Sequence, residues 1–290
     1  MSKYLNVFNT LSEYQAFSAS TEYVQPNVAL VKETNVLYYD YGDNKPQADM
    51  SNYKVESQET SVGGGNYGKG AITKVNYIPS GTTDMTAAFA DCSKLVSVPE
   101  IPSRVKNLRQ TFSGCTSLVN APEIPSGVTD MIQTFCGCIS LVNAPSVIPS
   151  GVTRMDGTFQ GCERLVTAPE MPSGITYMAA SFYDCIKLTN VPPLPSSLTN
   201  MRETFRHCRN LNKIEIPSGV TGMSYTFWNA IIRELTLLPT TPPYYSDTLQ
   251  YQYGLQTIYV PDESVDTYKA ATGWSEFADM IKPLSSKPTE

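Results

Sequence analysis

The sequence predicts an α/β repeat fold: a right-handed solenoid of about seven coils of 23 residues, between a small β-rich N-terminal module and a C-terminal cap. Seven segments, from "MTAAFADCSKL" to "MSYTFWNAIIR", align without gaps, and their phenylalanines are spaced 23, 23, 24, 23, 23 and 22 residues apart. A proline-rich stretch such as "LVNAPEIPSGVTDM" separates one segment from the next. Because one repeat cannot bury its apolar side alone, stacked repeats must share a core in which like residues lie on like.

The first half of each repeat predicts a short helix or a tight helical turn. Its apolar residues follow the spacing Met–x3–Phe–x2–Cys–x2–Leu, which places them on one buried face. The second half has two prolines and usually a glycine, so it predicts a short strand with corners at those residues. We expect the core to contain a phenylalanine column (Phe89, Phe112, Phe135, Phe159, Phe182, Phe205 and Phe227) and a cysteine column (Cys92, Cys115, Cys138, Cys162, Cys185 and Cys208), with Ala230 replacing cysteine in the last repeat.

The pattern "F-x-G-C-x-x-L" followed by "I-P-S-G-V-T-x-M" resembles the BspA-like leucine-rich repeats of gut bacteria and their phages. The resemblance covers residues 78–230, about half of the chain. It implies a leucine-rich-repeat solenoid over these residues. It implies little about function, because repeat scaffolds serve many binding roles.

Residues 1–61 predict a separate anchoring or assembly module. A strand and a short helix are expected in "YLNVFNTLSEYQAF", and "NVALVKETNVLYYDYG" predicts a β-hairpin with a polar turn near residues 32–35. The pattern "F-x-T-x-x-E-Y-x-A-F … P-N-V-x-x-V-x-E-T-x-x-V-x-Y" resembles the N-terminal segment of structural proteins from crAss-like and related gut phages. Residues 62–77 are expected to form a glycine-rich linker and a first cap strand.

Residues 231–290 predict a cap that covers the exposed end of the repeat array. "LTLLP" and "LQTIYVP" predict strands, and the segment after Pro261 predicts a helix with Asp262 as its N-cap and Gly273 as its stop. The tyrosine-rich stretch 242–254 is either a loop folded over the last coil, which we favour, or a recognition surface.

Composition narrows the function. The net charge of −6 argues against a protein that binds nucleic acid or anionic membranes. No apolar run approaches the roughly 18 residues of a membrane helix, so we expect no membrane insertion. The N-terminus lacks the apolar region of a signal peptide, so we expect either a protein that works without Sec export, such as a virion component made in the host cytoplasm, or a sequence that has lost its leader. With seven cysteines, a fully paired disulfide framework is excluded.

Three apparent chemical motifs do not predict a site. Cys136 and Cys138 are best explained as one surface and one core cysteine, since a metal needs three or four converging ligands. His207 falls in a column of Gly, Asp and Asn, which indicates a left-handed turn rather than a catalytic base. The match of "GGGNYGKG" to a phosphate loop lacks the Ser or Thr that holds Mg²⁺ and the helix that should follow. We therefore expect no enzyme activity, cofactor or metal.

A candidate binding face follows the buried phenylalanines. The residue directly after each phenylalanine varies between repeats, so this column should face solvent, where Arg and aromatic residues suit binding hot spots. The alternative, that these are ordinary solvated residues, is at least as well supported. The candidates are Gln160, Tyr183, Arg206 and Trp228, with Arg109 and Arg202 flanking them.

The preferred function is that of a non-enzymatic virion structural protein, such as a head fibre, decoration or tail accessory protein. In this hypothesis the N-terminal module contacts other virion proteins, the chain forms a homo-oligomer, and the solenoid recognises a host-surface glycan or protein. The alternative is a bacterial cell-surface BspA-like adhesin that binds glycan or protein.

Overall fold

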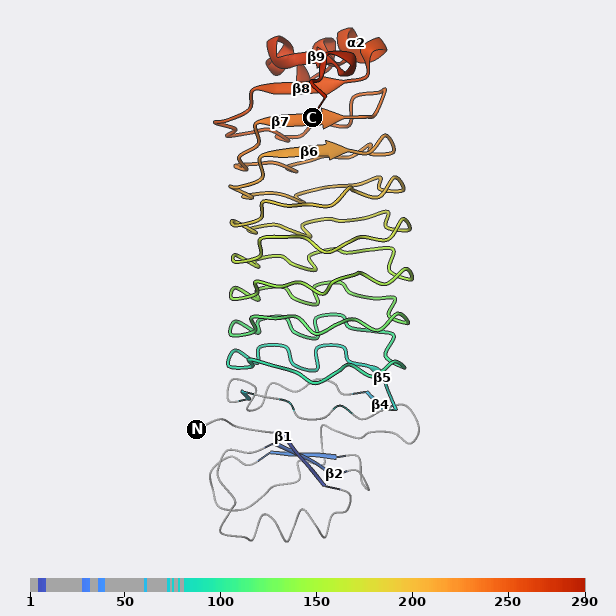
Figure 1. The fold of residues 1–290 in the computed structure, drawn as a ribbon, viewed down its shortest axis with the longest axis vertical. Helices are drawn as coiled ribbons and strands as arrows, with labels where there is room; N and C mark the ends of the chain where they lie inside the picture. Colours follow the sequence, from blue (N-terminus) through green and yellow to red (C-terminus); the bar gives the residue numbers. More distant parts are fainter. Residues whose placement is uncertain are drawn as a thin grey trace.

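The structure is a computed structural model that describes the strands at 5–8, 28–31, 36–39 and 60–61, the four residues Ile72, Thr73, Val75 and Ile78, and residues 81–289. Over residues 81–289, successive repeats lie on one another as layers along the long axis of the molecule (Figure 1). Main-chain hydrogen bonds join each layer to the next. Phe112 N donates to Thr134 O at 2.9 Å, and Phe135 N donates to Thr158 O at 2.9 Å.

Three strands of the N-terminal segment form one small sheet. Strand β1 (Leu5–Phe8) pairs in parallel with β2 (Val28–Val31), which pairs antiparallel with β3 (Val36–Tyr39). The predicted first strand and the two antiparallel strands of the predicted hairpin are therefore confirmed, and the hairpin turn near residues 32–35 lies outside the described residues. The short helix expected after the first strand, and the glycine-rich stretch 63–70, lie outside the described residues. Strand β4 (Thr60–Ser61) pairs in parallel with β5 (Thr82–Asp84).

Of the two alternatives predicted for the first half of each repeat, the short helix is wrong, and with it the α/β assignment for this region. These segments are successive turns. Each contains two residues with positive φ, four positions apart, for example Gln133 (φ 55°) and Gly137 (φ 72°). A left-handed residue cannot continue a right-handed helix. The N–H groups bond across repeats instead, as from Gln133 to Asp156 O at 2.9 Å.

The second half of each repeat is extended, but proline limits its pairing. In the earlier repeats it forms single bridges, such as Asn120 to Asn143 and Thr167 to Asn190. The later part of the chain forms a parallel sheet in the order β6-β7-β8-β9, in which the first three strands contain no proline and the edge strand β9 ends at one. Its strands are β6 (Lys213–Ile216), β7 (Glu234–Leu237), β8 (Thr257–Val260) and β9 (Ile281–Pro283). Strands β7 and β8 confirm the two strands predicted after residue 231.

The core is a set of stacked columns. The seven repeat phenylalanines are buried, and neighbouring rings stack with centroids 5.4–5.8 Å apart. The cysteine column is buried beside them, and from Cys115 to Cys208 each thiol donates a hydrogen bond to a phenylalanine carbonyl of the preceding repeat at 3.1–3.2 Å. The cysteine column therefore contributes both buried surface and hydrogen bonds between repeats.

The repeat pattern continues into the tyrosine-rich stretch, which is therefore not a loop laid over the last repeat. Asp247 and Tyr251 have the same pair of positive φ angles, 48° and 59°. Phe227 N donates to Thr248 O at 3.0 Å, as in the preceding repeats. Leu249 is buried at the position that corresponds to phenylalanine.

A short helical region closes this end of the stack. It consists of η2 (Asp262–Ser264), α2 (Val265–Ala270), η3 (Trp274–Met280) and, after β9, η4 (Leu284–Ser286). Gly273, with φ 80°, separates α2 from η3, as predicted. The N-cap prediction is wrong, because Asp262 Oδ1 instead accepts a hydrogen bond from Ser285 N at 2.9 Å.

Candidate recognition surface

Three of the predicted binding residues meet in space. Tyr183, Arg206 and Trp228 follow buried phenylalanines of successive repeats, so the stacking places them next to one another. The guanidinium carbon of Arg206 lies 4.3 Å from the ring centroid of Trp228 and 5.4 Å from that of Tyr183. Tyr225 approaches the same carbon at 5.9 Å. Cation–π contacts at these distances hold the guanidinium flat among the rings.

His207 lies beside this group. Its Nδ1 is 2.5 Å from Asp184 Oδ1, and its ring centroid lies 5.3 Å from Tyr183 and 5.0 Å from Trp228. Its φ of 63° confirms the predicted left-handed turn, as do the positive φ angles of Asp184 and the other members of this column. We call Tyr183, Arg206, His207 and Trp228 the aromatic–arginine cluster.

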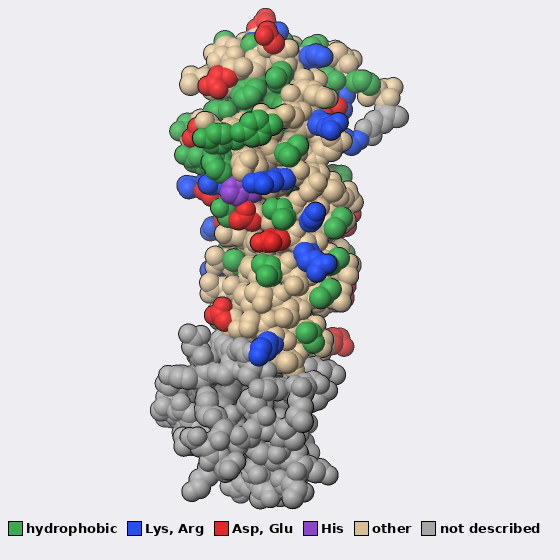
Figure 2. Space-filling view, turned by 90° about the vertical axis from the view of Figure 1, so that its left-hand side faces the viewer, with side chains coloured by type: hydrophobic (Ala, Val, Ile, Leu, Met, Phe, Trp, Pro, Cys, Tyr) green, Lys and Arg blue, Asp and Glu red, His purple; other side chains and the backbone are tan. Residues whose placement is uncertain are grey.

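The repeat that follows extends the cluster with residues that the sequence analysis did not assign to it. Tyr251 meets Trp228 edge-on, with centroids 5.2 Å apart. Tyr251 and Tyr253 are 51% and 82% exposed, and Ile231 is also exposed. Hydrophobic side chains gather over this region beside His207, the chain's one histidine, in Figure 2. The signal in the sequence was the 22-residue spacing from Asn229 to Tyr251, which repeats that from His207 to Asn229.

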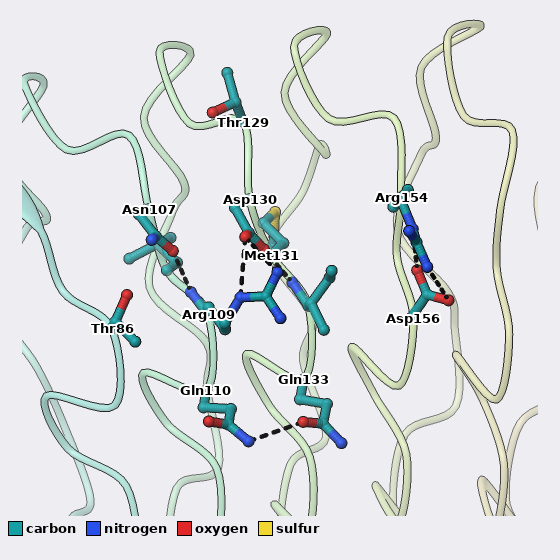
Figure 3. A network of polar contacts seen from close by, with 12 residues as sticks. Thr86, Asn107, Arg109, Gln110, Thr129, Asp130, Met131, Gln133, Arg154 and Asp156 are labelled. Atoms are coloured by element: carbon teal, nitrogen blue, oxygen red, sulfur yellow. Dashed lines mark hydrogen bonds and ion pairs between the residues drawn. The ribbon is translucent and has the colours of Figure 1, made fainter.

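The remaining candidates lie apart from the cluster or at its edge. Arg202 pairs with Glu203 Oε1 at 2.9 Å, and Glu203 Oε2 lies 3.6 Å from Arg206 Nη1, so one carboxylate links Arg202 to the cluster. Gln160 occupies the column one repeat before Tyr183. Arg109 lies two repeats before Gln160 and is held by Asp130 through bonds of 2.9 and 3.1 Å from Nη2 and Nε (Figure 3).

The polar contacts around Arg109 join neighbouring repeats. Gln110 Nε2 donates to Gln133 Oε1 at 2.9 Å, alongside the Arg109–Asp130 pair (Figure 3). Arg154 instead turns to Asp156 of its own repeat, at 2.9 Å. The polar side chains of this part of the turn face are thus engaged with one another by hydrogen bonds and ion pairs.

The cysteines form no reactive group. All seven are free thiols, and burial raises the pKa of Cys138 to about 12. Cys136 is half-buried, and its pKa is also raised by burial. Within residues 81–289 and the other described positions, no three His, Cys, Asp or Glu side chains are arranged to hold a metal ion. None of the helices in the described part of the chain is long and apolar enough to span a membrane.

A groove of about 740 Å³ lies on the strand side. The segment 189–194, strand β6 and the pair Lys287–Pro288 contribute to its walls, which contain several prolines and aliphatic side chains. None of the cluster residues lines it. The aromatic–arginine cluster is therefore a surface feature that is separate from this groove.

The sequences of the repeats identify the protein family. The sequence pattern described as "BspA type Leucine rich repeat region" matches residues 47–165 and 131–256, with six copies. The chain belongs to the BspA-type leucine-rich repeat family. Leucine-rich repeat proteins are in general binding scaffolds without enzyme activity, so the family directs attention to surfaces such as the cluster.

One solved structure agrees with the fold of this BspA-type protein, and a second, less similar one is also matched. A leucine-rich repeat protein from Bacteroides ovatus is 25% identical, with a TM-score of 0.51, over 76% of this chain and 62% of that one. One from Eubacterium ventriosum is 18% identical over 79% of this chain and 59% of that one, with a TM-score of 0.45. The chain thus spans less than two thirds of the length of either protein. No curated protein matches it.

Proposed function

We propose that this BspA-type protein is a non-enzymatic surface-recognition protein that binds its partner through the aromatic–arginine cluster. The observation that carries the proposal is the convergence of Tyr183, Arg206 and Trp228 from successive repeats onto one half-buried patch. Trp, Tyr and Arg dominate binding hot spots because they offer large contact areas and directed hydrogen bonds. Exposed Tyr251 and Tyr253 enlarge this patch.

Replacing the two rings tests the proposal. We expect Tyr183→Ala with Trp228→Ala to weaken binding to bacterial or host cells at least tenfold, because a hot-spot residue contributes about 2 kcal/mol or more. Alanine suits this column, since Ala90 occupies it in the first repeat. The measurement is flow cytometry of the labelled protein on cells. Circular dichroism establishes that the variant is folded.

Gln110→Ala with Gln133→Ala is the matched control. These residues lie on the same turn face in earlier repeats, and Ala87 and Ala180 adopt the same left-handed backbone in that column. We expect unchanged binding. Equal binding by the cluster variant and the wild type would refute the proposed site.

Two placements of this recognition protein are proposed. Family membership, together with the Bacteroides ovatus neighbour, supports the surface of a bacterium, where it would act as an adhesin. The resemblance of the N-terminal segment to phage structural proteins supports a virion, with a homo-oligomeric N-terminal module bound to other virion proteins. In either case we propose that the repeats form a right-handed solenoid. Mass spectrometry of purified phage particles and of bacterial surface fractions distinguishes the placements, and light scattering measures the oligomeric state.

A further inference from the structure

Arg206 is held in a way that favours an anionic ligand. Its guanidinium lies against Trp228, Tyr183 and Tyr225, and its side chain is 25% exposed, against 62% for Arg202. The planar group therefore has covered faces, while its N–H donors lie in its plane. Because the side chain is already ordered, little conformational entropy is lost when a ligand binds.

The charges around Arg206 are not balanced. Arg206 and Arg202 share the one carboxylate of Glu203, at 3.6 and 2.9 Å. The Nε of Arg206 is buried and has no hydrogen-bond partner. The other nearby carboxylate, Asp184, is engaged by His207. This surface is therefore complementary to a negative group.

The backbone here offers no edge to a peptide. The N–H groups of Asp184, His207 and Asn229 each donate to the next repeat, at 2.9–3.0 Å. A peptide that binds by adding a strand needs free main-chain groups, and these are already paired. Recognition at the cluster must come from side chains. Tyr251, which is 51% exposed, and the half-buried ring of Trp228 provide aromatic surface for the C–H face of a sugar ring.

From this combination we propose that the ligand is an acidic glycan, whose carboxylate pairs with Arg206 while a sugar ring packs on Trp228 and Tyr251. The proposal rests on the proposed function, because it names the chemistry of the partner at the same site. A planar guanidinium can donate two parallel hydrogen bonds to a carboxylate, an arrangement that an ammonium group cannot reproduce.

Paired probes test the carboxylate. Isothermal titration calorimetry on the full chain would use oligogalacturonate, sialyllactose and hyaluronan oligosaccharides, each beside its neutral methyl ester. We expect at least one acid to bind, its ester to bind about tenfold more weakly or worse, and the affinity to fall with added salt. Binding of no acid, or equal binding of acid and ester, would overturn the proposal.

Variants then test the residue. Arg206→Gln should lose about tenfold or more in affinity for the acid, and Arg206→Lys should recover only part of it, because the ammonium lacks the paired donors. The control is Arg164→Gln, an exposed arginine of an earlier repeat, which should bind as wild type. Wild-type affinity in Arg206→Gln would overturn the assignment.

The acidic-glycan assignment and the recognition site fail separately. If cell binding requires Tyr183 and Trp228 but none of the acids binds, the recognition site stands and the acidic ligand is wrong. If an acid binds but the variant with Tyr183→Ala and Trp228→Ala binds cells as well as the wild type does, the proposed function is wrong.

Discussion

At the scale of single residues, a buried hydroxyl joins each repeat to the one before it. The residue preceding each core phenylalanine from the second repeat onward is Thr or Ser, and its Oγ donates to a main-chain carbonyl of the preceding repeat at 2.6–2.9 Å. Buried polar groups are tolerated only when they are hydrogen-bonded, and these all are. The hydroxyl column therefore adds directional bonds to a core that is otherwise held by ring and aliphatic packing.

One member of this column gives a direct test. Thr204 Oγ1 donates to Met178 O at 2.8 Å in the core. Thr204→Val keeps the shape but removes the donor, so we expect the free energy of unfolding to fall by about 1–2 kcal/mol. Urea denaturation measures the change. Thr199→Val is the control, because Thr199 makes the same kind of bond at 3.1 Å on the exposed surface and should change stability by less than about 0.5 kcal/mol. Equal losses would contradict a special role for the buried column.

At the scale of the element, the repeat turn explains why the helix prediction failed. The sequence carries a signal for one left-handed column, where Gly, Asp, Asn and His recur. It carries almost no signal for the second left-handed column. The φ angles there are near 55° at Gln110, Gln133, Glu203 and Tyr225. These residues do not favour that conformation by themselves. Hydrogen bonds to the next repeat compensate for the strain, such as Gln110 N to Ile132 O at 2.9 Å.

The positions that recur in every repeat could be predicted more accurately from the sequence. A fixed period was enough to predict that Tyr183, Arg206 and Trp228 share a column. Tyr251 was missed because its repeat replaces the marker residues, with Leu249 in place of phenylalanine and Gln252 in place of cysteine. Which exposed residues pack together depends on side-chain directions in three dimensions, which periodicity does not give.

The substitution at Gln252 is itself testable. Its Nε2 donates to Phe227 O at 2.6 Å, which is the bond that cysteine thiols make elsewhere, and its Oε1 accepts from Ile232 N at 3.3 Å. Gln252→Ala should destabilise this repeat by about 1–2 kcal/mol. Hydrogen exchange should therefore accelerate mainly in residues 244–255. The control is Gln250→Ala, whose side chain is exposed. Acceleration spread evenly over all repeats would contradict this local role.

At the scale of the whole molecule, the turn face changes along the stack. The early repeats carry small residues or paired polar ones there, such as Ala90, Ser113 and Gln133. The rings collect in the later repeats, next to the closing helical region. That region is fastened by Trp274 Nε1, which donates to Pro243 O at 2.9 Å, and by Tyr268 Oη, which donates to Pro239 O at 2.8 Å. The cluster therefore lies near the end of the array that is closed by the helical region.

The continuous thiol column gives the whole molecule a dependence on alkaline pH. Burial raises the pKa of the core thiols above their usual 9.0, and that of Cys138 reaches about 12. A neutral thiol is thus favoured in the folded state. The contribution of this neutral thiol to the free energy of unfolding is fully present below pH 9. It is lost as the pH rises from 9 towards the folded-state pKa, because the thiol of the unfolded chain releases its proton first. The effect should add over the stacked repeats.

Comparing two pH values isolates one thiol. At pH 10 each such thiol should lower the free energy of unfolding by about 1.4 kcal/mol relative to pH 7.5, since a difference of one pKa unit corresponds to that free energy. Urea denaturation of the wild type and of Cys138→Ala at both pH values measures the difference. Alanine is suitable because Ala230 occupies this column in a later repeat, although the variant should be less stable at either pH through its lost volume and hydrogen bond. The loss between pH 7.5 and pH 10 should be smaller in Cys138→Ala by about 1.4 kcal/mol. If both proteins lose the same amount, the thiol column does not set the alkaline limit, and tyrosine or lysine titration does.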